Sequence, residues 1–168
     1  MKLSSYVIKS ILLILIVTSG NIRPGDAAPV TPKALAPAFR VTSLDGQVFD
    51  LADLHGKVVV LNLWFIGCPP CRKEIPELNN LVEEFKGKDV VFLALAPDRA
   101  EELRAFIKEQ PFNYHIVPEA KQVIKRYGGW VYPKHIIINK EGRIEWVKRG
   151  GGKNRYEDLR SVIERLLS

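Results

Sequence analysis

Cysteine is scarce in this chain: there are two among 168 residues, and both fall within one four-residue stretch. A closed structural zinc site needs four ligands. The three histidines, His55, His115 and His135, are scattered along the chain, and the first two are expected at the surface or in loops. Two cysteines and these histidines therefore do not favour a zinc site. No cysteine lies directly after the apolar segment near the amino terminus, so attachment of a lipid to an amino-terminal cysteine is excluded.

Long basic blocks, internal repeats and low-complexity segments are also missing from the sequence. The formal net charge of +6 is spread along the chain, with no basic stripe interleaved with aromatic residues. This pattern argues against a nucleic-acid partner. With 46% hydrophobic residues, the length suits one globular domain with its own core.

The amino-terminal apolar run, Ile11 to Val17, is much shorter than the roughly 20 residues that span a bilayer. Lys2 and Lys9 lie around its start and small residues follow it, as in an export leader covering residues 1–20. Two alternatives stay open: a short uncleaved membrane tether in which Lys9 snorkels, and a buried amino-terminal helix. Export would place the cysteines outside the cytoplasm, in the periplasm or on the outer face of the cell membrane, where disulfides persist.

Residues 21–37 contain four prolines and several alanines, which predicts a linker before a domain covering residues 38–168. Within that domain, runs rich in β-branched residues alternate with segments of helical periodicity. The expected elements are a hairpin from Phe39 to Leu51, strands at 57–65 and 90–95, helices from Cys71 to Gly87, at 100–109 and at 120–127, a hairpin over 134–148, and a helix at 156–167. This order predicts an α/β sandwich in which helices flank a mixed central sheet, preceded by an N-terminal β-hairpin.

The two cysteines form the motif Cys68-Pro69-Pro70-Cys71 between a predicted buried strand and a predicted helix. A bridge closing so short a loop would stabilise the fold by only about 2 kcal/mol, against roughly 3 for a 15-residue loop. Stability alone therefore explains the spacing poorly, and a redox dithiol explains it better. At the helix start, free N–H groups would favour a Cys68 thiolate as the attacking group, and a more buried Cys71 would resolve the mixed disulfide.

The residues around this motif resemble those of thioredoxin-fold proteins, with Trp64 before the first cysteine and Pro76 after the second. The longer string from Val58 to Leu78, including Asn62, is similar to the TlpA/ResA branch of exported disulfide reductases, related to the redoxin and AhpC-TSA proteins. The resemblance implies a thioredoxin-like fold and a thiol-disulfide oxidoreductase. The expected partner is an exported disulfide-containing protein, for which an apocytochrome c, another secreted protein or a stress-linked target would all fit. A membrane thiol electron donor would have to restore the dithiol, because the exterior of the cell offers little soluble reductant. No cofactor is expected.

By the same resemblance, Tyr132-Pro133 is the cis-proline dipeptide, which would turn its backbone toward the dithiol and pair with an extended substrate. An ordinary trans proline opening a strand is the alternative. The residues expected to contact a substrate are Trp64, Pro69, Pro70, Tyr132 and Pro133. Lys134-His135 departs from the small hydroxyl residues common after this proline.

Two acidic residues lie near the motif. Asp98 follows the second buried strand at about the place where TlpA/ResA-type proteins carry an acidic residue, and is expected either to relay a proton or to cap the next helix. Glu74 is interpreted as a solvated helix position.

No cation stands between the cysteines to stabilise the reduced form, which favours a reductase over an oxidant. The main rival function is a copper(I) metallochaperone using Cys68, Cys71 and His135. The layout also resembles peroxiredoxins, but these place the attacking cysteine in a Thr-x-x-Cys context, whereas this chain has Phe65-Ile66-Gly67-Cys68, so a peroxidase is disfavoured.

Overall fold

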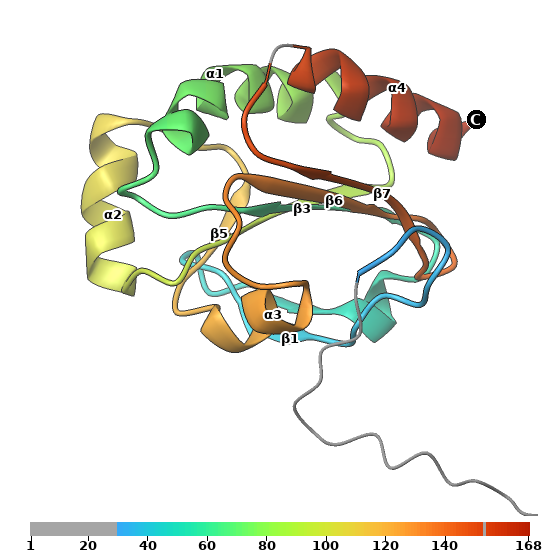
Figure 1. The fold of residues 1–168 in the computed structure, drawn as a ribbon, viewed down its shortest axis with the longest axis horizontal. Helices are drawn as coiled ribbons and strands as arrows, with labels where there is room; N and C mark the ends of the chain where they lie inside the picture. Colours follow the sequence, from blue (N-terminus) through green and yellow to red (C-terminus); the bar gives the residue numbers. More distant parts are fainter. Residues whose placement is uncertain (1–29, 153) are drawn as a thin grey trace, which may run out of the picture.

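The structure is a computed structural model that describes residues 30–152 and 154–168. Its strands and helices follow one another in the order shown in Figure 1. The elements are β1 (Arg40–Thr42), β2 (Val48–Asp50), the 3₁₀ turn η1 (Leu51–Leu54), β3 (Val58–Leu63), α1 (Pro69–Glu84), β4 (Val90–Leu95), α2 (Ala100–Glu109), β5 (His115–Val117), α3 (Lys121–Arg126), β6 (Lys134–Ile138), β7 (Ile144–Arg149) and α4 (Arg155–Leu167).

Five strands form one mixed sheet in the order β5-β4-β3-β6-β7. The β3, β4 and β5 strands are parallel, whereas β6 runs antiparallel to both β3 and β7. Helices α1 and α4 cover one face, and α3 with the β1–β2 hairpin covers the other (Figure 1). This arrangement confirms the predicted α/β sandwich with a mixed sheet and an N-terminal hairpin.

The central strand β3 is buried on both faces, as its continuous apolar sequence predicts. Val58 and Val60 point into the cluster beneath α1 and α4, while Val59 and Leu61 point into the cluster beneath α3. By this alternation Asn62 faces α1. The strand therefore joins the two halves of the core and delivers a polar side chain to the face where the cysteines lie.

The sequence analysis missed β5, and His115, expected at the surface or in a loop, begins this strand with a side chain that is 38% exposed. Three residues are too few to show a period of two, so only pairing with β4 defines the strand. Helix α3 is shorter than predicted. Gly128 and Gly129, at φ +89 and +74, end it with backbone conformations that side chains disfavour.

The predicted leader, residues 1–20, lies outside the described residues, as does the first part of the predicted linker. From residue 30 onward this linker packs on the β6–β7 hairpin: the Lys33 N–H donates to the Ile144 carbonyl at 2.7 Å, and Leu35 forms a bridge with Arg143. The domain boundary predicted at residue 38 thus separates residues 30–37 from a domain against which they pack. None of the helices in the described part has the length and apolar character needed to cross a bilayer.

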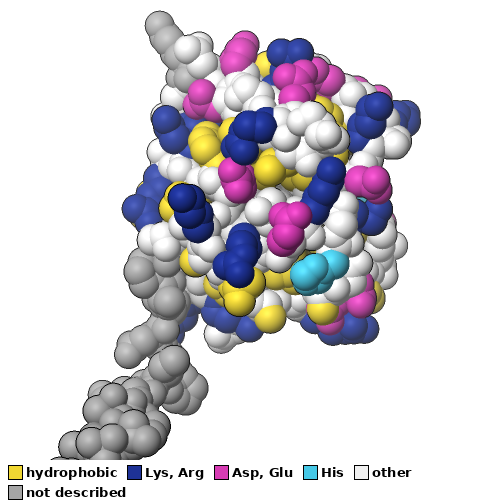
Figure 2. Space-filling view, turned by 90° about the vertical axis from the view of Figure 1, so that its right-hand side faces the viewer, with side chains coloured by type: hydrophobic (Ala, Val, Ile, Leu, Met, Phe, Trp, Pro, Cys, Tyr) yellow, Lys and Arg dark blue, Asp and Glu magenta, His cyan; other side chains and the backbone are white. Residues whose placement is uncertain are grey.

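Figure 2 shows the end of the molecule that carries the β6–β7 turn and the carboxyl end of α4. Basic and acidic side chains are interspersed on this face. A surface of this kind lacks the single-sign field that a nucleic acid requires.

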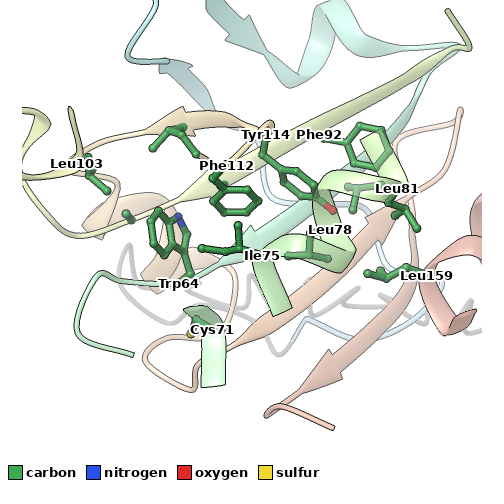
Figure 3. Close-up of a cluster of buried hydrophobic side chains, with 14 of the residues drawn as sticks. Trp64, Cys71, Ile75, Leu78, Leu81, Phe92, Leu103, Phe112, Tyr114 and Leu159 are labelled. Atoms are coloured by element: carbon green, nitrogen blue, oxygen red, sulfur yellow. The ribbon is translucent and has the colours of Figure 1, made fainter. Parts of the chain in front are cut away.

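We expect Leu78→Ala to lower the free energy of unfolding by about 2–5 kcal/mol, because it would leave a cavity beneath α1. Leu78 is 1% exposed and lies in the cluster of Figure 3. Denaturant titration would measure the loss. Leu35→Ala is the matched control, since that leucine is 67% exposed, and should change stability by less than about 0.5 kcal/mol. Equal losses at both positions would contradict the packing described here.

Candidate active site

The two cysteines lie where β3 passes into α1, at the carboxyl end of the central strand. Cys68 is the residue that caps the helix, and Cys71 lies in its first turn. Their sulfurs are joined in a disulfide of 2.00 Å, with the Cα atoms 5.3 Å apart. The strand-to-helix junction predicted from the sequence is therefore present, and the motif occupies it in the oxidised form.

The sulfur of Cys68 takes the place that a hydroxyl or carboxylate takes in an ordinary helix cap. Its Sγ accepts a hydrogen bond of 3.3 Å from the Cys71 N–H. Pro69 and Pro70 occupy the first two helical positions, where a missing N–H leaves no bond unmade. After reduction, this N–H and the positive end of the helix would both stabilise a thiolate at Cys68.

Burial does not distinguish the two cysteines as the sequence analysis expects. In the disulfide, Cys68 is 3% exposed and Cys71 is 2% exposed. The expected difference between an exposed first sulfur and a more buried second one is absent from this oxidised form, in which both cysteines lie in the same buried cluster. What separates them is the helix cap.

Trp64 supports the dithiol from inside the core. Its side chain is completely buried, and its ring lies 5.4 Å from that of Phe106 and 5.3 Å from that of Phe112, between centroids. Figure 3 shows it in the same buried cluster as Cys71. The expectation that Trp64 contacts a substrate is therefore wrong, because other aromatic rings already cover the indole.

The Tyr132-Pro133 peptide bond is cis, as the resemblance implies. Pro133 is buried and Tyr132 is half-buried, with its ring 5.1 Å from that of Phe65. The neighbouring Trp130 and Val131 are 57% and 49% exposed. Sequence reasoning missed these two large apolar residues, although their position after Gly128-Gly129 in a predicted loop was a usable signal.

A second loop approaches the dithiol from the carboxyl end of β7. The Gly150 N–H donates to the Pro133 carbonyl at 2.8 Å. A Cβ atom placed on Gly151 would lie 3.2 Å from the Cβ of Pro70, so only glycine allows this close approach without displacement. Pro69 and Pro70 are both exposed, and Pro70 is the one that this loop approaches.

Asp98 does not cap α2, because the cap is Arg99, whose N–H donates to the Glu102 carboxylate at 3.2 Å. Instead, Asp98 Oδ2 accepts a hydrogen bond of 3.3 Å from the N–H of Ile66, just before the motif. Burial raises the pKa of Asp98. Of the two interpretations offered by the sequence, the cap is wrong and the proton relay stays a prediction.

The structure contradicts the interpretation of Glu74 as a solvated helix residue. It is 8% exposed, and its Oε1 lies 2.8 Å from Nε2 of the fully buried His135. Asn62 Nδ2 lies 3.4 Å from the same oxygen and 3.3 Å from His135 Nδ1. These contacts join α1, β3 and β6, so helical periodicity alone could not reveal them.

The proposed copper ligands do not assemble. Within residues 30–152 and 154–168, no three histidine, cysteine or acidic side chains gather as a metal site. His135 turns its ring nitrogens to Glu74 and Asn62 instead. The geometry therefore gives the copper(I) carrier no support.

Comparison with known proteins assigns this arrangement to a family. Residues 32–147 match the AhpC/TSA family. The chain belongs to this family. It is 32% identical over 133 residues to the thiol-disulfide oxidoreductase ResA of Bacillus thuringiensis subsp. konkukian, covering 78% of this chain and 76% of that protein.

Solved structures agree with this membership. A candidate DsbE thiol:disulfide interchange protein from Chlorobium tepidum superposes with a TM-score of 0.75 at 25% identity, covering 83% of this chain and 99% of that one. The thioredoxin domain of a thiol-disulfide oxidoreductase from Bacteroides vulgatus gives 0.69 at 29% identity, covering 82% and 99%. The protein is thus a ResA-like, thioredoxin-fold thiol-disulfide oxidoreductase, which confirms the predicted resemblance and enzyme class.

The raised pKa of Asp98 predicts how this oxidoreductase responds to pH. The folded state binds a proton at this carboxyl more tightly than the unfolded chain does. The contribution of Asp98 to stability therefore falls as the pH rises above 3.8, the ordinary pKa of an aspartate. Asp98→Asn removes this titration and keeps an acceptor for Ile66. The stability of the variant relative to the parent should therefore increase between about pH 3 and about pH 7, measured by denaturant unfolding at both.

Glu101→Gln, at an exposed carboxyl on α2, is the matched control and should show a smaller change over the same interval. A relative stability of Asp98→Asn that does not change with pH would reject the assigned direction.

Proposed function

We propose that this oxidoreductase reduces disulfides of exported proteins outside the cytoplasm, with Cys68 as attacking thiol and Cys71 as resolving thiol. The observation that carries the proposal is the helix cap, in which the Cys71 N–H points at Cys68 Sγ. A thiolate is stabilised by such a donor, and the thiolate is the nucleophile in disulfide exchange. The likeness to ResA supports this chemistry.

The reaction proceeds through a mixed disulfide. The Cys68 thiolate attacks one sulfur of the partner's disulfide, and the other partner sulfur leaves as a thiolate. Cys71 then loses its proton and attacks Cys68 Sγ, forming the Cys68–Cys71 bond and releasing the partner's second sulfur. Two electrons pass to the partner, whose two thiolates take up protons. A membrane thiol donor would return the electrons by the same exchange.

Glu74 is the group best placed to accept the Cys71 proton. It follows Cys71 by one helical turn, and side chains with this spacing share one face of a helix. Both residues are buried on the α1 side of the sheet. Asp98, bonded to the Ile66 N–H, is a second candidate for the proton relay predicted from the sequence.

Direction and location rest on sequence features. Pro69 and Pro70 place no cation between the sulfurs, and Arg72 and Lys73 are exposed, so their charges are screened by water. This setting favours reduction over oxidation. The amino-terminal leader, either cleaved or kept as a tether, would place the domain in the periplasm or on the outer face of the cell membrane, where an apocytochrome c is one suitable partner.

The exposed Trp130 and Val131, together with Tyr132 and Pro133, would contact the partner chain. An exposed tryptophan beside half-buried aromatic rings is typical of an interface anchor. An extended segment passing over Pro133 would bring its cysteine to Cys68 and its apolar neighbours to this rim.

Cys71→Ser should accumulate a mixed disulfide with an added protein disulfide such as insulin, because no second thiol resolves it. Non-reducing electrophoresis and mass measurement would detect the adduct. Cys68→Ser is the matched control and should form none. Trapping by Cys68→Ser instead would reverse the two roles, and failure of the unmodified chain to speed insulin reduction by dithiothreitol would reject the reductase.

Trp130→Ser should raise KM for insulin by about tenfold, which corresponds to about 1.4 kcal/mol of lost binding. The rate with a small aromatic disulfide such as Ellman's reagent should stay unchanged, because a small disulfide does not reach the rim. Leu35→Ser, which removes an equally exposed apolar group near Arg143, is the control. Equal effects of the two substitutions would show that Trp130 is not part of the partner surface.

A further inference from the structure

Three polar side chains meet in the core on the α1 face of the sheet, and the exchange reaction uses only Glu74. The other two, Asn62 and His135, are 1% and 0% exposed. They lie directly opposite each other in the β3–β6 register. Both reach the same oxygen: His135 Nε2 is 2.8 Å from Glu74 Oε1, and Asn62 Nδ2 is 3.4 Å from it. Asn62 Nδ2 lies 3.3 Å from His135 Nδ1 and 3.4 Å from its Nε2, and a neutral ring that is protonated at Nε2 can donate to the carboxylate.

The surroundings of this cluster contain few other charges. Tyr114 has a buried hydroxyl without a partner in the described part of the chain, and burial raises its pKa, with the charge of Glu74 adding to the shift. Lys148, opposite His135 on β7, is half-exposed and turns to Asp158, which also lies 3.8 Å from Arg155. A hollow touches Glu74 and opens to solvent, lined by Pro70, Lys73, Glu77, Gly151 and Gly152.

We propose that His135, assisted by Asn62, is a positioning residue that holds Glu74 ionised and ready to accept the Cys71 proton in the resolving step. The inference rests on the proposed function, because it concerns the same reaction. Hydrogen bonds to a carboxylate favour its charged form, whereas burial without donors favours the neutral acid. A neutral Glu74 could not take up a proton.

These groups account for the proton and for the bonds formed and broken in the resolving step. The Cys71 thiol gives its proton to the Glu74 carboxylate, which becomes a carboxylic acid still bonded to His135. The Cys71 sulfur attacks Cys68 Sγ, the Cys68–Cys71 bond forms, and the bond to the partner breaks with the electron pair on the partner's sulfur. The proton on Glu74 then passes to solvent through the hollow beside Pro70 or returns to Cys71 when the donor reduces the disulfide.

The test separates the two steps with Ellman's reagent. The reduced protein releases one coloured thiolate when Cys68 attacks and a second when Cys71 resolves the adduct. His135→Leu should leave the first phase unchanged and slow the second about tenfold near pH 7, with recovery at higher pH, which shifts the midpoint of its pH profile upward by about one unit. His135→Gln, which keeps an N–H donor, should restore most of the rate.

Further variants distinguish positioning from general destabilisation. Glu74→Gln should slow the second phase, and adding His135→Leu to it should have no further effect, because the two residues act through one carboxylate. Ile137→Val is the core control on the same strand and face. It should cost about 0.5–1.5 kcal/mol of stability without moving the pH profile. If His135→Leu fails to fold, Asn62→Ala should give a smaller shift in the same direction.

An unmoved midpoint in the folded His135→Leu variant would overturn this inference and leave the reductase intact. Additive effects of His135→Leu and Glu74→Gln would overturn it as well. Absence of the first phase in the unmodified protein would instead reject the proposed function itself.

Discussion

The antiparallel register between β3 and β6 is the constraint on which the site depends. Leu63 pairs with Lys134, the residue directly after the cis-proline, and Asn62 pairs with His135. Hydrogen bonding between the strands therefore places Pro133 beside the end of β3, where the chain turns into the dithiol. A shift of either strand by one residue would turn Asn62 or His135 away from the α1 face and from Glu74. Burial of β3 on both sides opposes such a shift.

The same central strand explains how a polar group can lie in the core. Glu74 on α1 points toward the sheet, where it would be costly without partners. Asn62 and His135 supply them from adjacent strands, so three elements must assemble before the carboxylate is satisfied. Stability and chemistry are coupled at this point, since the contacts that make burial of Glu74 tolerable are those proposed to keep it able to accept a proton.

Loops complete the site around this rigid frame. The segment that ends α3 presents Trp130 and Val131 to solvent, and the loop after β7 presses Gly151 against Pro70. Buried Lys134 supports the first loop by donating to the carbonyls of Tyr127 and Gly128 at 3.2 and 2.8 Å. The surface proposed for partner recognition thus lies on a segment that a buried side chain anchors through hydrogen bonds to its backbone.

By itself, the sequence determined the class of fold and the place of the chemistry. Continuous β-branched runs predict buried strands, and the helical spacing from Ile75 to Phe85 predicts α1, because both patterns depend on neighbours near in the chain. The position of Cys68 and Cys71 at a strand-to-helix junction follows from the same local patterns. The cis-proline came from resemblance.

Only the tertiary structure decided which groups meet. Trp64 was expected to contact a substrate and lies in the core, Glu74 was expected in water and pairs with His135, and Asp98 bonds Ile66 rather than capping α2. The short strand β5 likewise exists only through its pairing with β4. Each of these outcomes depends on contacts between segments far apart in the chain, and local periodicity carries no information about which distant segment will supply a partner.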